Sequence, residues 1–178
     1  SSSSLSVFKT GDLDMIEKPP ALEIPKLLKD GTAKEYSTLG TYYYSINTSD
    51  KATQKVLKDA RVRKALSYAL NRKDLVEQIV KLGKPATSIV PPGIKDDNGK
   101  DFNSKQYYKP EGDIAMAKKL LAEAGYPDGK GFPKVTLLYN NGEAHQSIAQ
   151  AVQEMWRKNL GVNIELKNQE WKVFQTTR

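Results

Sequence analysis

The sequence predicts an α/β fold, because its last third alternates between strand-like and helix-like patterns. Residues 134–139 form an apolar, β-prone run that ends at the turn residues 140–142 (Asn-Asn-Gly). Apolar side chains recur at helical spacing in residues 144–159, and they alternate with polar ones in residues 162–167. A strand, a crossover helix and a second strand make a βαβ unit with parallel strands. We therefore predict a mixed sheet in which the two strands are parallel and the helix covers one face.

The carboxyl ends of these two strands are the expected place for a binding site. In open α/β sheets, ligands bind in the crevice beyond the carboxyl ends of the strands. The segments that leave those ends are residues 140–145, which end in His145, and residues 168–171, which end in Trp171. This edge therefore gathers polar and aromatic groups.

Helices are predicted upstream of the βαβ unit. Residues 59–70 carry apolar residues at helical spacing behind an aspartate that can cap a helix. Asn71 and Asp74 have the spacing of a capping box for a second helix, which is expected to stop at Gly83. A third helix is predicted over residues 113–124 after a long loop rich in Asp, Asn, Lys and Gly.

The opening of the chain has too thin an apolar pattern to fold alone. Short helices are predicted over residues 5–9 and 22–28, and a short strand over residues 13–16. We expect the residues before Leu39 to pack poorly on the rest of the chain or to pair with a neighbouring chain.

A run of three tyrosines is the centre of a β-prone stretch over residues 36–47. Strand alternation places Tyr42 and Tyr44 on one face and Tyr43 on the other. These rings either fill a core or line a groove, and the pattern leaves both interpretations open.

Composition and motifs argue against several classes of function. The net charge of +7 comes from scattered lysines and arginines, which favours a solvated surface over a nucleic-acid patch. The chain has no cysteine and one histidine, His145, so a metal site would need His145 with scattered carboxylates at unfamiliar spacing. No apolar run approaches the ~20 residues of a membrane helix. No nucleophile elbow or phosphate-binding loop is present, so we predict neither an enzyme nor a cofactor.

Four runs of sequence resemble the extracytoplasmic oligopeptide-binding proteins of ABC importers, which are family 5 solute-binding proteins. The runs are TYYYSIN (41–47), DARVRKALSYALNRKDLVEQIV (59–80), AKKLLAEAGYPDGKGFPKVTLLYN (117–140) and MWRKNLGVNIELKNQEWKVFQTTR (155–178). The resemblance implies one lobe of a periplasmic-binding-protein-like, type II fold.

The resemblance also implies a division of the chain, because family members are much longer and this sequence matches their middle. Residues 1–39 would end the first lobe, and the chain would cross a hinge near Gly40. Residues 40–178 would form most of the third domain, which is the second lobe and is incomplete at its C-terminus.

The function that the resemblance implies is the capture of extended oligopeptides between two lobes. The partner would be the membrane permease of an ABC importer, and the location extracytoplasmic, with any membrane anchor at an N-terminus outside this chain. A receptor of the same family for dipeptides, nickel, heme or a sugar is the alternative. A basic nucleic-acid-binding module is the alternative from another class.

Four ligand-binding residues follow from the resemblance. Arg178, in an E-W-x(6)-R setting, matches an arginine near the carboxyl end of the bound peptide, and a guanidinium fork suits a carboxylate. His145 matches a histidine that approaches the same end in some complexes. Trp171 matches a tryptophan of a side-chain pocket, and Tyr43 falls near a tyrosine of the hinge strand.

Overall fold

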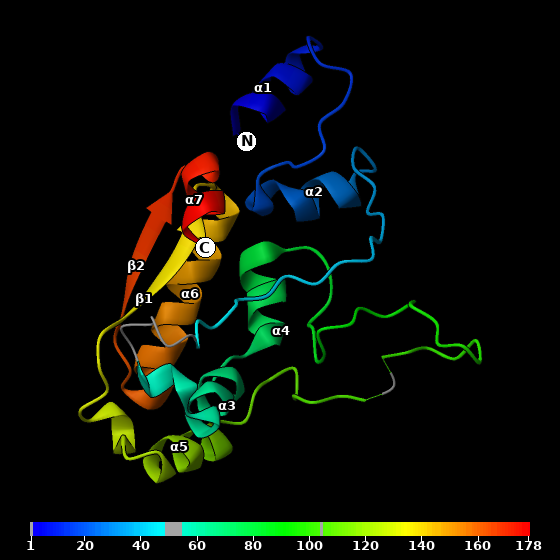
Figure 1. The fold of residues 1–178 in the computed structure, drawn as a ribbon. Coiled ribbons are helices and arrows are strands. Elements are labelled where there is room, and N and C mark those ends of the chain that lie inside the picture. Colours follow the sequence, from blue (N-terminus) through cyan, green and yellow to red (C-terminus); the bar gives the residue numbers. More distant parts are fainter. Residues whose placement is uncertain (1, 49–54, 104) are drawn as a thin grey trace.

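A computed structural model describes residues 2–48, 55–103 and 105–178 (Figure 1). The helices and strands are α1 (Ser2–Thr10), the 3₁₀ helix η1 (Ala21–Glu23), α2 (Ile24–Lys29), the 3₁₀ helix η2 (Lys55–Lys58), α3 (Ala60–Tyr68), α4 (Arg72–Asp74), the π-helix η3 (Leu75–Val80), α5 (Ile114–Glu123), the 3₁₀ turn η4 (Pro127–Gly129), β1 (Val135–Asn140), α6 (Glu143–Leu160), β2 (Ile164–Gln169) and α7 (Trp171–Thr177).

The predicted βαβ unit is confirmed. Strands β1 and β2 are parallel neighbours, and their register runs from Val135 opposite Ile164 to Asn140 opposite Gln169. Helix α6 lies along the sheet (Figure 1) and ends at Gly161, whose φ of 67° makes the expected left-handed cap. The described residues form no third strand, so the antiparallel strand that a mixed sheet requires is absent from them.

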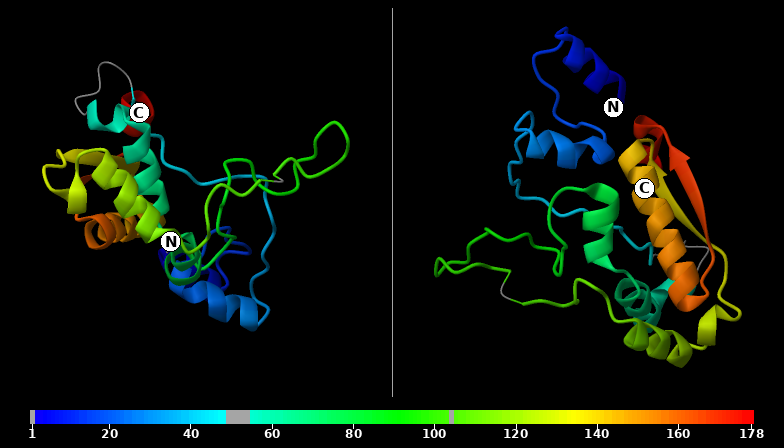
Figure 2. Two further views of the ribbon diagram at one scale, coloured as in Figure 1. Left: turned by 90° about the horizontal axis from the view of Figure 1, so that it is seen from below. Right: turned by 180° about the vertical axis from the view of Figure 1, so that it is seen from behind.

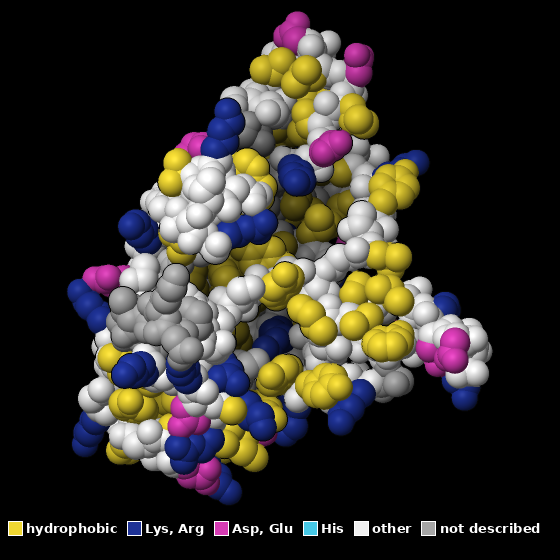
Figure 3. All heavy atoms as spheres, viewed as in Figure 1, with side chains coloured by type: hydrophobic (Ala, Val, Ile, Leu, Met, Phe, Trp, Pro, Cys, Tyr) yellow, Lys and Arg dark blue, Asp and Glu magenta, His cyan; other side chains and the backbone are white. Residues whose placement is uncertain are grey.

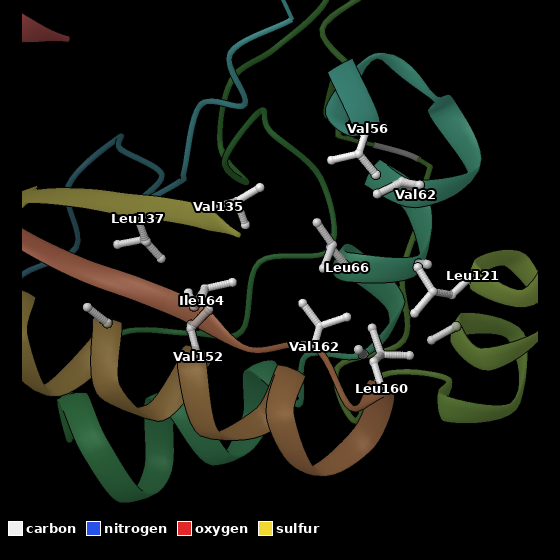
Figure 4. Close-up of a cluster of buried hydrophobic side chains, with 14 of the residues drawn as sticks. Val56, Val62, Leu66, Leu121, Val135, Leu137, Val152, Leu160, Val162 and Ile164 are labelled. Atoms are coloured by element: carbon white, nitrogen blue, oxygen red, sulfur yellow. The ribbon is translucent and has the colours of Figure 1, made fainter. Parts of the chain in front are cut away.

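The core lies where β1, β2 and α6 meet α3 and α5 (Figure 4). Its most deeply buried side chains are Val62, Leu121, Val152, Leu160 and Val162. Two side chains of α6 also donate hydrogen bonds to carbonyl oxygens of α3 and its C-cap: Trp156 Nε1 to Leu66 at 2.8 Å and Asn159 Nδ2 to Ala69 at 2.9 Å. These bonds satisfy carbonyl groups that a helix end leaves without intrahelical partners.

The predicted caps of the upstream helices are present. Asp59 accepts a hydrogen bond from Arg61 N at 2.8 Å, and Asn71 accepts one from Asp74 N at 3.0 Å. The helix that begins after Asn71 ends at Lys81, which has a φ of 61°, and not at Gly83 as expected. Most of this helix, Leu75–Val80, is a π-helix, and the left-handed backbone of Lys81 ends it two residues before Gly83.

Two predicted strands are not formed. Residues 13–16 and 41–47 have no strand in the structure, and neither segment has a neighbouring strand to complete a hydrogen-bonded ladder. Leu13 and Met15 are exposed, with 40% and 74% of their surface accessible, so a β-prone composition alone has not given a half-buried strand.

The opening segment packs mainly within itself and lies beside η3. Its buried side chains are Leu5, Ile24 and Leu27, which are not members of the main core cluster. Gly83 N donates to Glu35 Oε1 at 3.3 Å, which joins this segment to the end of the π-helix. The division of the chain at residues 39 and 40 stays a prediction.

A long segment between η3 and α5 projects away from the core (Figures 1 and 2). On it Ile89, Ile94 and Phe102 are exposed. The segment returns to the core at Tyr108, whose ring meets the edge of Tyr68 at 5.3 Å.

Arg72 completes this anchor at Tyr108. Its guanidinium lies 4.6 Å from the centroid of the Tyr108 ring and donates to Ser67 O and Ser67 Oγ, at 3.1 and 2.7 Å. Lys73 N also donates to Pro110 O at 3.0 Å. The partly buried Arg72 therefore ties the end of the projecting segment to α3.

We expect Arg72→Ala to lower the free energy of unfolding by ~1–3 kcal/mol, because it removes hydrogen bonds from a charged donor and a cation–π contact. Urea denaturation measures this difference. Arg157→Ala is the matched control, since its guanidinium pairs with Glu154 at 2.7 Å on the exposed surface. Equal midpoints for the two variants would contradict the anchoring role.

Candidate functional site

The carboxyl ends of both strands meet at one edge, as the sequence predicted. Beyond this edge α6 begins at Glu143 and α7 begins at Trp171 (Figure 1). Asn141 N donates to Gln169 O at 2.8 Å, and Asn168 Nδ2 donates to Asn141 Oδ1 at 2.9 Å. These two bonds hold the loop after β1 against the last two residues of β2.

His145 lies in the first turn of α6 and contacts Tyr42. Its Nδ1 is 3.0 Å from the Tyr42 hydroxyl, and the two rings stack with centroids 5.7 Å apart and planes at 19°. Tyr42 also meets the edge of Tyr44 at 5.8 Å. Burial raises the pKa of Tyr44, whose hydroxyl is buried without a hydrogen-bond partner among the described residues. Tyr42, Tyr44 and His145 thus form a small aromatic cluster at the amino end of α6.

Trp171 and Arg178 lie on opposite ends of α7 and share a contact with Phe174. The rings of Trp171 and Phe174 stack at 6.0 Å and 23°, and the Arg178 guanidinium is 5.9 Å from the Phe174 centroid. Glu170 caps this helix by accepting from Lys172 N at 2.8 Å. Trp171 is 52% exposed, so it lies on the surface of this chain and not in its core.

The structure brings only some of the predicted residues together. Among the described residues, no hydrogen bond or ring contact joins His145 to Trp171 or Arg178. Tyr43 is 63% exposed, and no ring contact involves it in the part of the chain described. The predicted residues therefore form two groups, one around His145 and one on α7, and Tyr43 makes no ring contact with either among the described residues.

Two members of these groups were not predicted from the sequence. Tyr42 was expected to share a face with Tyr44, and it does contact that ring, but its contact with His145 was not predicted. Phe174 follows Trp171 by three residues and precedes Arg178 by four, which is the spacing of neighbours on one helical face. That signal would have identified Phe174 if a helix had been expected after residue 170.

Hollows and charged groups lie elsewhere on the surface. Cavities of about 330 and 420 Å³ lie between α2 and η3, and beside α4 and α6. Figure 3 shows Lys and Arg side chains dispersed among Asp and Glu on one face. In the described ranges no group of three or more His, Asp or Glu is placed to hold a metal ion, and no helix is long and apolar enough to cross a bilayer.

Comparison with known proteins assigns the chain to a protein family. All of it, residues 1–178, matches the model of the bacterial extracellular solute-binding proteins, family 5, middle region. The chain belongs to this family. The predicted resemblance is confirmed, and the family is one of binding proteins.

Individual relatives of this family 5 chain cover almost all of it. It is 40% identical to the oligopeptide-binding protein OppA of Bacillus subtilis and 41% identical to the periplasmic murein peptide-binding protein MppA of Escherichia coli. Each match covers 96% of this chain and 31% of the relative. The family 5 chain therefore spans about a third of the length of these relatives.

The fold of this family 5 chain is also that of its relatives. The crystal structure of Haemophilus influenzae OppA in complex with RPPGFSPFR superimposes with a TM-score of 0.76 at 30% identity. The match covers 99% of this chain and 34% of that one. The predicted α/β lobe of a periplasmic-binding-protein-like fold is confirmed.

Proposed function

We propose that the protein is the substrate-binding component of an ABC peptide importer, which captures extended oligopeptides between two lobes. Residues 40–178 supply one lobe and residues 1–39 belong to the other. The observation that carries this proposal is the exposed aromatic and cationic surface of α7, which begins directly beyond the carboxyl end of β2.

The chemistry of this surface suits the carboxyl end of a peptide. The Arg178 guanidinium does not lose its proton and can bind a carboxylate through two parallel hydrogen bonds. Trp171 offers a flat apolar face to a peptide side chain. His145 would approach the ligand from the first turn of α6. Tyr43 would approach it from the extended segment before residue 49.

The proposed partners and location follow from the family. The ligand is an unmodified peptide, which the protein passes unchanged to the membrane permease of the importer. It acts outside the cytoplasm, and any membrane anchor lies N-terminal to this chain. The Haemophilus relative bound to a nonapeptide supports a peptide ligand.

Calorimetry on the full-length protein tests this function. We expect heat of binding with free peptides of graded length, and recovery of the same peptides intact after long incubation. Dipeptides, nickel, heme and sugars are the comparison ligands, and duplex DNA at low salt tests the nucleic-acid alternative. Binding of one of these with no binding of longer peptides would overturn the proposal, and cleaved peptide would indicate an enzyme.

A further inference from the structure

The contact between Tyr42 and His145 joins two parts of the chain that are 103 residues apart. Tyr42 lies in the extended segment before residue 49, and His145 lies at the amino end of α6. The hydroxyl and Nδ1 are 3.0 Å apart, and the rings stack at 19°. Distance and stacking together restrict both the position and the rotation of the imidazole.

Basicity decides which of the two groups donates the proton. A neutral imidazole nitrogen binds a proton at a pH near 6.5, whereas a phenol oxygen gives one up only near pH 10. The ring nitrogen is therefore the better acceptor and the hydroxyl the better donor. Burial raises the pKa of Tyr42, which keeps the proton on its hydroxyl. The Tyr42 hydroxyl donates to Nδ1.

This direction fixes the tautomer of the imidazole. When Nδ1 of a neutral histidine accepts a hydrogen bond, the proton of the ring is on Nε2. Nε2 then becomes a donor, and no other side-chain hydrogen bond of His145 is found within the described residues. An N–H donor suits an oxygen acceptor, such as a peptide carbonyl or a carboxylate.

We propose that Tyr42 is a positioning residue for His145, which it holds as the Nε2–H tautomer so that the imidazole donates a hydrogen bond to an oxygen of a bound peptide. The ligand part of this inference rests on the proposed function. The tautomer part rests on the geometry of the chain alone.

Two neighbours keep the pair in place. Tyr44 packs against the main core and meets Tyr42 edge to face, with planes at 82°. On the other side, a Cβ atom at Gly142 would lie 3.0 Å from Cδ2 of His145, so the absence of a side chain there leaves room for the imidazole. The ring of His145 thus contacts Tyr42 and occupies space that a side chain at residue 142 would need.

Nitrogen NMR of the full-length protein tests the tautomer directly, with the resonances of His145 identified by their loss in His145→Ala. In protein labelled with ¹⁵N-histidine, with the imidazole in its neutral form, we expect Nδ1 unprotonated and Nε2 protonated. Tyr42→Phe should shift the tautomer ratio toward Nδ1–H by about five-fold, which corresponds to about 1 kcal/mol, the worth of one hydrogen bond. Tyr43→Phe is the matched control and should leave the ratio unchanged.

An Nδ1–H tautomer in the unsubstituted chain would overturn the proposal, and so would an unchanged ratio in folded Tyr42→Phe. If Tyr42→Phe fails to fold, the tautomer of the unsubstituted chain still decides.

Binding of tetra-alanine to the full-length receptor tests the ligand part. Tyr42→Phe should weaken it three- to ten-fold, and should have no further effect in a His145→Ala background, because residues that act through one another are not additive. Additive losses would contradict positioning. A receptor that binds no peptide, with the tautomer as expected, would refute the proposed function and leave the tautomer assignment intact.

Discussion

Arg178→Ala is expected to weaken the binding of peptides with a free carboxyl end by roughly thirty-fold or more in the full-length receptor. Removing one partner of a desolvated charge pair typically costs ~2–5 kcal/mol, because the other charge is left without compensation. Thirty-fold corresponds to about 2 kcal/mol. Peptides amidated at the carboxyl end lack the charge and should lose much less.

The local structure supports this expectation for Arg178. Its guanidinium is near Phe174, at 5.9 Å, and no ion pair with a carboxylate of the described chain occupies it. Arg178→Lys keeps the charge but loses the planar fork, so we expect it to recover only part of the affinity.

Calorimetry with paired free and amidated peptides measures these effects. Arg157→Ala is the control, since Arg157 is paired with Glu154 on the exposed side of α6. Equal losses for free and amidated peptides would remove Arg178 from the carboxylate.

The βαβ unit and the helix caps could be predicted because their signals are local. The alternating pattern of β2 and the helical spacing in α6 each report burial on one face, and both elements form within one or two residues of the expected bounds. Asp59 and Asn71 were recognisable as caps because a side chain at that position bonds to a backbone N–H only two or three residues later.

The two strands that did not form have a common physical cause, which is that strand formation depends on a distant partner. Residues 41–47 have the composition of a strand, yet no neighbouring strand pairs with them. Helix α7 was missed for a different reason, which is its low helix propensity. Its sequence contains Val173, Phe174 and Thr176, which are weak helix formers, and the Glu170 cap starts the helix.

Only part of the candidate site could be predicted. The edge that gathers the loops after β1 and β2 follows from strand direction, and the sequence located it. The contact of His145 with Tyr42 does not follow from any local pattern, because it joins residues 103 positions apart in the sequence.

The close approach of two glycines at the carboxyl end of α6 predicts the largest effect on stability. Gly161 has a φ of 67°, and a Cβ atom there would overlap the carbonyl oxygen of Asp128. A Cβ atom at Gly129 would overlap the carbonyl oxygen of Gly161 in the same way. The turn before β1 therefore packs backbone to backbone against the end of α6. Strand β2 begins three residues after Gly161.

We expect Gly161→Ala to lower the free energy of unfolding by ~2–4 kcal/mol, measured by urea denaturation with an unchanged m-value. Left-handed backbone strain supplies part of this loss and the steric overlap supplies the rest, since backbone atoms cannot move aside as a flexible side chain can. Gly125→Ala separates the two contributions, because Gly125 has a φ of 94° but nothing lies within 4 Å of its Cβ position. That control should lose only ~1–2 kcal/mol, the cost of the strain alone. If both variants lost the same amount, the packing of the turn against Gly161 would contribute nothing to the stability of the lobe.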